Sequence, residues 1–592
     1  MTRRSGLVLV LAVLALALSG CVSLPRDGSV RTVSVSDRGE SDTLVDYTPS
    51  GPEKGSAPVP LVDGWLDAMR ATPLNTFVAR QFLSANSRGR WVPEKGTLVY
   101  GSKQLISRPG GRVLLRLDQV RALDERGSWL GDPTQGRGTT IDLRLVRDGG
   151  EWRIANPPDR LVIPESHFDG QYQQYFLYFF DKTAQVLVPE PVYVPRGLQT
   201  PTLLVSGLLK GPQQDLADVE RTFVPRGTAL DGISVPVSRD GTAEVPLSDK
   251  VLDVDDGQLN LIFAQLAWTL GQVSGLERMR VTVDGTPVDL PGARLDVSVG
   301  QWSQFDPAVA WASTSMFGLR QGRVAAVDDG KEKRVTGAFG ALPVGLRSIG
   351  VDLPAQRIAA VSSDGHRVLE ADRDRVPGRS VGPDDVRTLY AGGTNLLPPD
   401  YDLYGQLFVV DRTSLGAELS VIRAGVRRAV EVPGITGRTV QRFALSRDGT
   451  RLVFQVRTGS ADRLYTARVR RDSSGRVRGV NAAQALPLTG AGVREIKDMD
   501  WRTPGSLAVL AGQRGGTSQV LIVKVDGSSS PEDLSTDAEL FRDQAASVTT
   551  SPAVGSPLYI GTASGQLFSL ATTGRWTGTS IDPGLAGTTF VG

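Results

Sequence analysis

The sequence predicts a multi-domain protein in which two α+β domains precede an all-β C-terminal region. The chain has 592 residues, enough for three or four domains of ~150 residues each. Up to about residue 299, segments with helical spacing of apolar residues occur together with short strand-like runs. From residue 300 onward, short β-rich runs and glycine-containing turns follow one another to the end. This change of pattern separates the all-β region from the rest.

Composition excludes several functional classes. The formal net charge is +2, from 66 basic and 64 acidic residues, so no overall field would attract nucleic acid. The chain holds two histidines, His167 and His366, and we expect both to be solvated. A zinc site would therefore need mostly carboxylate ligands, and a histidine-activated nucleophile would depend on one of these two residues. We expect no catalytic residues, no metal and no cofactor.

The N-terminus has the pattern of an export signal. Arg3 and Arg4 precede an apolar run over residues 7–18. A positive start, about 7–15 apolar residues and small residues before a cleavage site are typical of secretory signals. The run is shorter than the roughly 20 residues that span a membrane. Four residues end the segment: Leu18, Ser19, Gly20 and Cys21.

The Leu-Ser-Gly-Cys sequence resembles the lipobox of bacterial lipoproteins. The resemblance implies an S-diacylglyceryl and an N-acyl group on Cys21 after cleavage. An ordinary secretory signal is the alternative, but Cys21 is the single cysteine of the chain and stands where lipidation requires it. Two or more acyl chains anchor a protein stably. We therefore expect a lipid anchor on the outer face of the cytoplasmic membrane, with residues 21–58 as a flexible tether poor in large apolar residues.

Residues 59–165 form the first α+β domain. Val62, Trp65 and Leu66 have helical spacing, and a second helix is predicted to start at Pro73. Strands are predicted over residues 97–100, 112–120, 139–147 and 152–156. The last strand, Trp152 to Ala155, followed by two prolines, resembles the end of NTF2-like cone folds. We expect the interior to be a packed core.

Residues 170–299 form the second α+β domain. An aromatic strand over residues 172–180 precedes a helix over 201–209, which Gly211-Pro212 ends. Asp240-Gly241 predicts a hairpin, and apolar residues from Leu259 to Val273 predict an amphipathic helix. The helix end at residues 208–212, the turn at 224–228 and the helix around 265–270 resemble the GerMN domain of spore-germination proteins. The resemblance implies binding or assembly at a cell envelope.

Residues 300–592 contain repeated turns of one type. Asp364, Asp448 and Asp526 each precede glycine after a short β-rich run; aspartate supplies a turn acceptor and glycine a positive φ. Such turns resemble those in the blades of WD-type and TolB-type β-propellers. At ~40–45 residues a blade, the region allows six or seven blades. A pair of β-sandwiches is the alternative.

The order of these parts resembles the LpqB family of actinobacterial lipoproteins, as does the proline-rich stretch at residues 397–407. The resemblance implies an accessory partner of the extracytoplasmic domain of the sensor kinase MtrB, in the MtrAB two-component system, which influences cell-wall homeostasis and division. Two alternatives remain open. One is a receptor for a small cell-wall fragment, bound in the propeller channel or the first domain. The other is an envelope hydrolase that uses carboxylates such as Asp364, Asp448 or Asp526.

Overall fold

The computed structural model describes residues 46–592, except residues 135, 291–294, 489–492, 494, 514–515, 529–539 and 542–543. Cys21, the lipobox residues Leu18, Ser19 and Gly20, and most of the expected tether lie outside the described residues. The part of the tether that is described already contacts the first domain, because the backbone N–H of Tyr47 donates to the carbonyl oxygen of Thr72 (2.9 Å).

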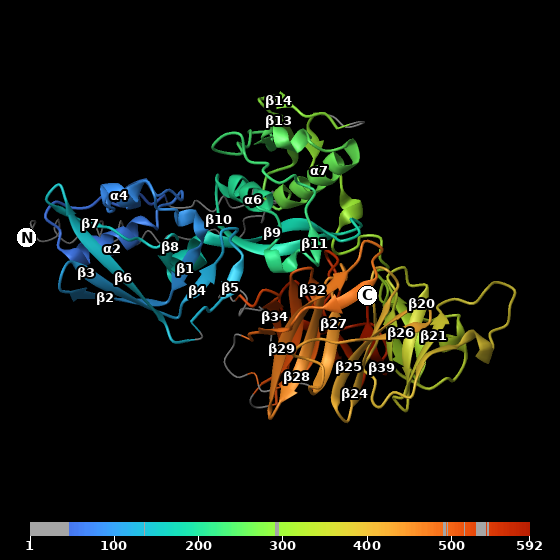
Figure 1. Cartoon of the computed structure of the whole chain (residues 1–592). Coiled ribbons are helices and arrows are strands. Elements are labelled where there is room, and N and C mark those ends of the chain that lie inside the picture. Colours follow the sequence, from blue (N-terminus) through green and yellow to red (C-terminus); the bar gives the residue numbers. More distant parts are fainter. Residues whose placement is uncertain are drawn as a thin grey trace, which may run out of the picture. The chain divides into compact units, whose positions relative to one another are not determined.

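The first domain packs short helices against two sheets (Figure 1). The helices are α2 (Pro58–Ala68), α3 (Phe77–Gln81) and α4 (Ala85–Arg88). One sheet has the order β5 (Trp129–Gly131), β4 (Arg121–Leu123), β1 (Thr97–Tyr100), β8 (Leu161–Pro164). The other has the order β2 (Ser102–Arg108), β3 (Arg112–Asp118), β6 (Thr139–Asp148), β7 (Glu151–Ile154).

A continuous apolar core fills this domain. Trp65 of α2 is fully buried, and its ring centroid lies 6.0 Å from that of Trp91. Leu115 and Leu143, on neighbouring strands, are also fully buried. The second helix begins at Phe77, four residues later than expected. Before it, the chain bends at Pro73, and the side chain of Asn75 donates to the carbonyl oxygen of Pro73 (3.1 Å).

The second domain combines a three-stranded sheet, a four-stranded sheet, one short helix and two longer ones. The helices are α5 (Glu165–Gln171), α6 (Thr200–Leu209) and α7 (Asp256–Leu270). The first sheet has the order β10 (Leu187–Pro195), β9 (Tyr172–Asp181), β11 (Glu220–Arg221). In the second, β13 (Arg278–Val283) pairs with β12 (Thr242–Pro246), β14 (Thr286–Pro287) and β15 (Val297–Ser298).

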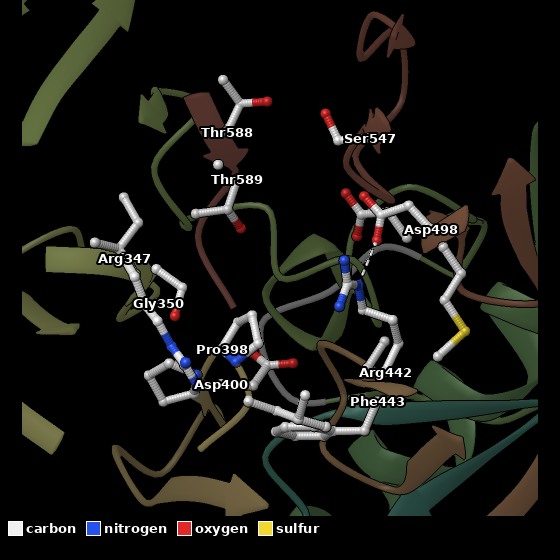
Figure 2. A pocket seen from close by; sticks show the side chains of 18 of the residues that line it. Arg347, Gly350, Pro398, Asp400, Arg442, Phe443, Asp498, Ser547, Thr588 and Thr589 are labelled. Atoms are coloured by element: carbon white, nitrogen blue, oxygen red, sulfur yellow. Dashed lines mark hydrogen bonds and ion pairs between the residues drawn. The ribbon is translucent and has the colours of Figure 1, made fainter. Parts of the chain in front are cut away.

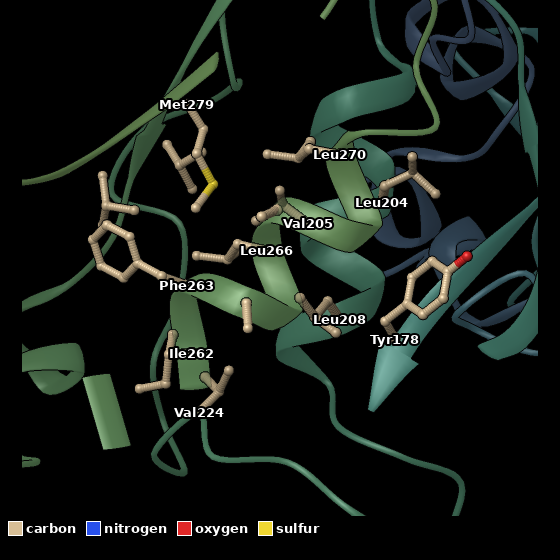
Figure 3. Packing of buried hydrophobic residues seen from close by; sticks show 14 of the residues in the cluster. Tyr178, Leu204, Val205, Leu208, Val224, Ile262, Phe263, Leu266, Leu270 and Met279 are labelled. Atoms are coloured by element: carbon tan, nitrogen blue, oxygen red, sulfur yellow. The ribbon is translucent and has the colours of Figure 1, made fainter. Parts of the chain in front are cut away.

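Helices α6 and α7 form the centre of this domain's core. Leu204, Val205 and Leu208 of α6 lie near Leu266 and Leu270 of α7 (Figure 3). All of these side chains are fully buried, so the two helices share one apolar interface.

A buried polar side chain connects α7 to two other segments. Gln265 is fully buried; its Nε2 donates to the carbonyl oxygen of Tyr178 (2.9 Å) and its Oε1 accepts from the backbone N–H of Phe223 (2.9 Å). Both ends of the amide therefore have hydrogen-bond partners, which offset the free-energy cost of burying it.

The hairpin predicted at Asp240-Gly241 is only partly present. Gly241 has φ +75°, as the turn requires, and Val237 forms a single antiparallel bridge with Ala243. The following strand, β12, instead pairs in parallel with β13. Local turn chemistry is correct, but a remote strand takes the partner position.

The C-terminal region contains six antiparallel sheets in the described residues, which we name sheets I–VI. Sheet I consists of β39 (Leu585–Thr589), β16 (Met316–Arg320), β17 (Arg323–Asp328) and β18 (Lys331–Arg334). Sheet II consists of β19 (Leu346–Val351), β20 (Arg357–Ser362), β21 (Arg367–Asp372) and β22 (Arg387–Ala391). Sheet III consists of β23 (Asp400–Tyr401), β24 (Leu407–Thr413), β25 (Gly416–Arg423) and β26 (Val426–Val430).

The remaining sheets follow in chain order. Sheet IV consists of β27 (Val440–Leu445), β28 (Arg451–Thr458), β29 (Ala461–Arg471), β30 (Val477–Val480) and β31 (Gln484–Leu486). Sheet V consists of β32 (Glu495–Thr503), β33 (Ser506–Gly512) and β34 (Ser518–Lys524). Sheet VI consists of β35 (Ala545–Thr549), β36 (Tyr559–Thr562), β37 (Leu567–Leu570) and β38 (Trp576–Gly578).

The first strands of the six sheets form a closed ring. Strand β39 contacts β19, and the contacts continue through β23, β27, β32 and β35 back to β39. Because β39 is the last strand of the chain and joins β16 at the start of the region, the ring is closed by its two ends. In the described part of the region, the α-helical content is the short α8 (Ala338–Ala341). No described helix is long and apolar enough to cross a membrane.

Candidate functional site

A cavity of about 340 Å³ lies at the centre of the ring. Every first strand contributes to its wall, as do the residues that lead into β23. Prominent lining residues are Arg347, Pro398, Asp400, Arg442, Asp498, Asp500, Ser547 and Thr588. A cavity of this size lies within the range of small-molecule sites, and charged side chains are prominent in its wall (Figure 2).

Three aspartates of the wall connect neighbouring sheets. Each accepts a backbone N–H from the next sheet: Leu445 donates to Asp400 (2.9 Å), Val548 to Asp498 (3.1 Å) and Thr550 to Asp500 (2.8 Å). These bonds fix the first strands against one another.

Burial perturbs the aspartates strongly. It raises the pKa of Asp400 to about 7 and the pKa of Asp500 to about 8, although backbone N–H donors oppose the shift. Burial also raises the pKa of Asp498, against the opposing charge of Arg442. Asp498 lies 3.3 Å from Arg442 Nε, whereas no ion pair within 4 Å is found for Asp400 or Asp500 in the described residues.

Three arginines lie at the cavity. Arg442 pairs with Asp498, while Arg347 donates to Asn395 Oδ1 (2.9 Å) and to the carbonyl oxygen of Leu396. Figure 2 shows Arg347 and Arg442 on opposite sides of the view, with Pro398 and Asp400 between them.

The third arginine, Arg412, is incompletely satisfied. Its Nη1 donates to Gln441 Oε1 (3.3 Å), and its buried Nε–H has no acceptor in the described part of the chain. Burial lowers the pKa of Arg412, and the charges of Arg442 and Arg347 lower it further. The three guanidinium groups therefore form one positive region, and Asp498 is the one carboxylate within ion-pair distance of them among the described residues.

Arg447 lies beyond the other end of the first strand of sheet IV. Its guanidinium donates to the carbonyl oxygens of Ala308 (3.2 Å) and Val591 (3.1 Å). Burial lowers the pKa of Arg447 to about 10, against the charges of Asp500, Asp306 and Asp400. The side chain thus connects the segment before the ring to the segment after its last strand.

A second polar cluster joins the six-sheet region to the second domain. Arg451 is 1% exposed, and its Nη2 donates to the carbonyl oxygen of Pro189 (2.5 Å) and to Glu190 Oε1 (2.7 Å). Arg468 Nη2 donates to Glu190 Oε2 (2.7 Å). We call Glu190, Glu220, Asp448, Arg451 and Arg468 the junction cluster.

The pKa values of the two glutamates of the junction cluster are shifted in opposite directions. Burial raises the pKa of Glu190, but the charges of Arg468 and Arg451 outweigh burial and lower it overall. The pKa of Glu220 is raised well above its ordinary value by burial and then by the charge of Glu190. Glu190 therefore holds a negative charge more readily than Glu220 does in this cluster.

The three aspartates that the sequence offered for acid–base chemistry accept hydrogen bonds within their own β-turns. Asp364 accepts from the backbone N–H of His366 (3.0 Å), and Asp448 accepts from Ser446 Oγ (2.7 Å) and from Thr450. Asp526 accepts from Ser528 Oγ (2.6 Å) and from Gln174 Nε2 of the second domain (3.1 Å). The structure does not bring the three together at the cavity.

The two histidines differ in burial. His366 is exposed, as expected, and its Nδ1 lies 2.6 Å from the carbonyl oxygen of Gly393. The expectation for His167 is wrong: the side chain is half-buried, and burial together with the charge of Arg70 lowers its pKa to about 4. In the described ranges, no group of three or more His, Cys, Asp and Glu side chains is arranged to hold a metal ion.

Sequence reasoning missed the cavity aspartates and arginines. One signal was present: Asp498 and Asp500 are separated by one residue in a strand and so share a face. The other members come from different sheets, so their spacing in sequence carries no information about their proximity.

Family models match all three folded parts of the chain. A model of the lipoprotein LpqB N-terminal domain matches residues 51–169, a sporulation and spore germination model matches 176–289, and a model of the LpqB β-propeller domain matches 322–579. These matches confirm the GerMN-like and propeller expectations. The NTF2-like resemblance of the first domain stays a prediction.

Whole-length relatives agree with these matches. Lipoprotein LpqB of Thermobifida fusca is 28% identical, with 93% of this chain and 94% of that protein covered. Lipoprotein LpqB of Cutibacterium acnes is 27% identical, with 89% and 90% covered. Lipoprotein LpqB of Streptomyces coelicolor is 28% identical, with 86% and 87% covered.

Proposed function

Because the chain belongs to the LpqB family of lipoproteins, we propose that it is a lipid-anchored accessory protein that binds the extracytoplasmic domain of the sensor kinase MtrB. The chain is a lipoprotein of the cell envelope, and Cys21 would carry its acyl groups on the outer face of the cytoplasmic membrane. By binding the kinase, the protein would influence cell-wall homeostasis and division. Such an effect requires different affinities for two states of the kinase.

The junction cluster is the observation that carries this proposal. It joins the GerMN-like domain and the six-sheet region through buried charged groups, and Tyr404 Oη adds a hydrogen bond to Asp181 Oδ2 (2.6 Å). Separating the two parts would expose or unpair buried charges, at a high cost in free energy. These contacts would hold the two parts together when a partner binds to either. We infer that the six sheets are the six blades of a propeller.

The hydrogen bonds of the acidic side chains in the described residues favour a binding function over a catalytic one. The cavity aspartates accept backbone N–H groups from neighbouring sheets, and Asp364, Asp448 and Asp526 accept hydrogen bonds within turns. Chemistry at a site requires a nucleophile or an acid–base pair free to approach a substrate. We therefore propose that the protein is not an enzyme.

The direct test is a titration of the mature chain, residues 21–592 with Cys21→Ser, against the purified extracytoplasmic domain of the kinase. We expect saturable binding. Absence of binding at about 100 µM of either protein would overturn the proposal. The same substitution in cells should release the protein from the membrane fraction, and its retention there would contradict lipidation at Cys21.

Exposed apolar side chains locate the candidate interfaces. Leu415 and Val426 of sheet III are 83% and 70% exposed, and Leu198 and Ile233 of the GerMN-like domain are 93% and 98% exposed. Leu415 precedes β25 and Val426 follows it, so the first pair probes both ends of sheet III. Replacing each pair by serine, in separate variants, compares the two parts of the protein without disturbing a core. We expect one pair to weaken kinase binding at least tenfold and the other to serve as its matched control. Equal binding by both variants and the parent would place the interface elsewhere.

A further inference from the structure

The wall of the central cavity is positively charged at one end. Arg347 is the second residue of β19 and Arg442 the third residue of β27, so both stand near the beginning of first strands. Arg447, which contacts Ala308 and Val591, follows the end of β27. The positive groups Arg347 and Arg442 therefore mark one end of the cavity, whereas Arg447, beyond the opposite end of β27, does not line it.

The positive end lacks the carboxylates that would neutralise it. Three guanidinium groups stand against one carboxylate, Asp498, within ion-pair distance among the described residues. Arg412 has a single side-chain hydrogen bond there, to Gln441, and a buried Nε–H without an acceptor. Like charges brought together in a partly buried place repel one another unless an anion lies between them.

Arginine is the side chain best suited to such an anion. Its planar guanidinium presents five N–H donors in a fork that matches the oxygens of a phosphate or a carboxylate. Charge-assisted hydrogen bonds of this kind are about twice as strong as neutral ones. The volume of about 340 Å³ is at the lower end of ligand pockets, so a small organic molecule fits better than a polymer.

The cavity wall also contains acceptors of hydrogen bonds. Asp400 and Asp500 line the wall and receive only backbone N–H groups in the described residues. Carboxyl oxygens have room for about four hydrogen bonds. Hydroxyl or ammonium groups on the same ligand would therefore find partners in the wall, beside the hydroxyl groups of Ser547 and Thr588.

We propose that the cavity binds a small organic oxyanion, with its phosphate or carboxylate held by Arg412 between Arg347 and Arg442 and its hydroxyl or ammonium groups facing Asp400 and Asp500. This site is separate from kinase binding, so one can fail while the other holds. A sugar phosphate and a sugar acid share the chemistry that the site recognises, and both are used in the test.

The experiment measures binding by calorimetry to residues 21–592 with Cys21→Ser. The probes are glucose 6-phosphate, glucuronate and, as the uncharged control, glucose. We expect at least one anion to bind with a Kd of about 1 mM or tighter, and glucose to bind at least tenfold more weakly. A preference between the two anions would distinguish phosphate from carboxylate. Equal affinity for glucose, or no binding of either anion at about 10 mM, would overturn the proposal.

Substitutions then locate the site. Arg412→Gln removes the central charge, and Arg347→Gln removes an exposed charge, which leaves the core untouched; each should weaken anion binding at least tenfold. The matched control is Arg428→Gln, because Arg428 is an exposed arginine of β26 that donates to the carbonyl oxygen of Val477 (2.9 Å) away from the cavity wall. Unchanged affinity in Arg347→Gln and in folded Arg412→Gln, or equal weakening in Arg428→Gln, would refute the assignment.

Discussion

Replacing Glu190 by glutamine tests whether the junction cluster holds the two parts of the protein together. Glu190 accepts from Arg451 and Arg468, each at 2.7 Å, and Arg451 is 1% exposed. Removing one partner of a buried ion pair costs about 3–5 kcal/mol of the free energy of unfolding. Glu220 can replace part of the lost negative charge, however, because the pKa of Glu220 is raised partly by the charge of Glu190.

This compensation by Glu220 determines the expected changes in the free energy of unfolding. Once Glu190 is neutral, the second cause of the raised pKa of Glu220 disappears, and Glu220 ionises to replace part of the lost charge. We therefore expect Glu190→Gln to cost about 1–3 kcal/mol and the double variant with Glu220→Gln to cost about 3–5 kcal/mol. Glu220→Gln by itself should cost less than about 0.5 kcal/mol, since glutamine matches the uncharged form that burial and the charge of Glu190 favour at this position.

The assay is urea unfolding at pH 7, followed by tryptophan fluorescence, of the parent, both single variants and the double variant. These four proteins form a double-mutant cycle. The control is Asp253→Asn, which breaks the exposed pair with Lys250 (3.4 Å) and should cost no more than about 0.5 kcal/mol. A coupling energy below about 0.5 kcal/mol, or a Glu190→Gln effect equal to that of the control, would refute the reasoning.

Two further predictions follow from other buried groups. Burial raises the pKa of Asp500 from 3.8 to about 8, so the folded state holds one more proton than the unfolded state between these two pH values. The free energy of unfolding should therefore fall by about 1.4 kcal/mol per pH unit as the pH rises through this range. Asp500→Asn should remove this slope from the plot of unfolding free energy against pH between pH 5 and 7, as measured by urea unfolding. An unchanged slope in the variant would contradict the burial of an acid at this position. Gln265→Leu leaves the Phe223 N–H and the Tyr178 carbonyl without these partners and should lower the free energy of unfolding by about 2–4 kcal/mol. The control, Gln258→Leu on the exposed face of the same helix, should lower it by less than about 0.5 kcal/mol. Equal urea midpoints for the two variants would count against the assigned role of Gln265.

Local patterns predicted most elements that depend on nearby residues. Strand β1 occupies residues 97–100 as expected, because its apolar run lies between two glycines. Helix α7 begins where Asp255 accepts from the backbone N–H of Gln258 (2.9 Å). The turn at Gly241 also formed, but its expected hairpin is reduced to a single bridge, since β12 pairs in parallel with β13, a partner that local sequence cannot reveal.

The candidate sites could not be derived in the same way. Arg451 and Glu190 are separated by 261 residues, and the cavity residues come from all six sheets. Proximity of this kind depends on closure of the ring, which pairs β39 with β16. Composition supplied the charged residues, whereas topology alone decided which of them meet.

One part of this topology is nevertheless readable from the sequence. In a sheet of successive antiparallel strands, turns after the first and third strands lie on one face of the ring, and turns after the second strand lie on the other. Asp448 follows the first strand of sheet IV and is 1% exposed, and Asp526 follows the third strand of sheet V and contacts Gln174 of the second domain. Asp364 follows the second strand of sheet II and is 49% exposed. The same Asp-Gly turn therefore lies either at the domain junction or in solvent, and the position of its strand within the sheet decides which.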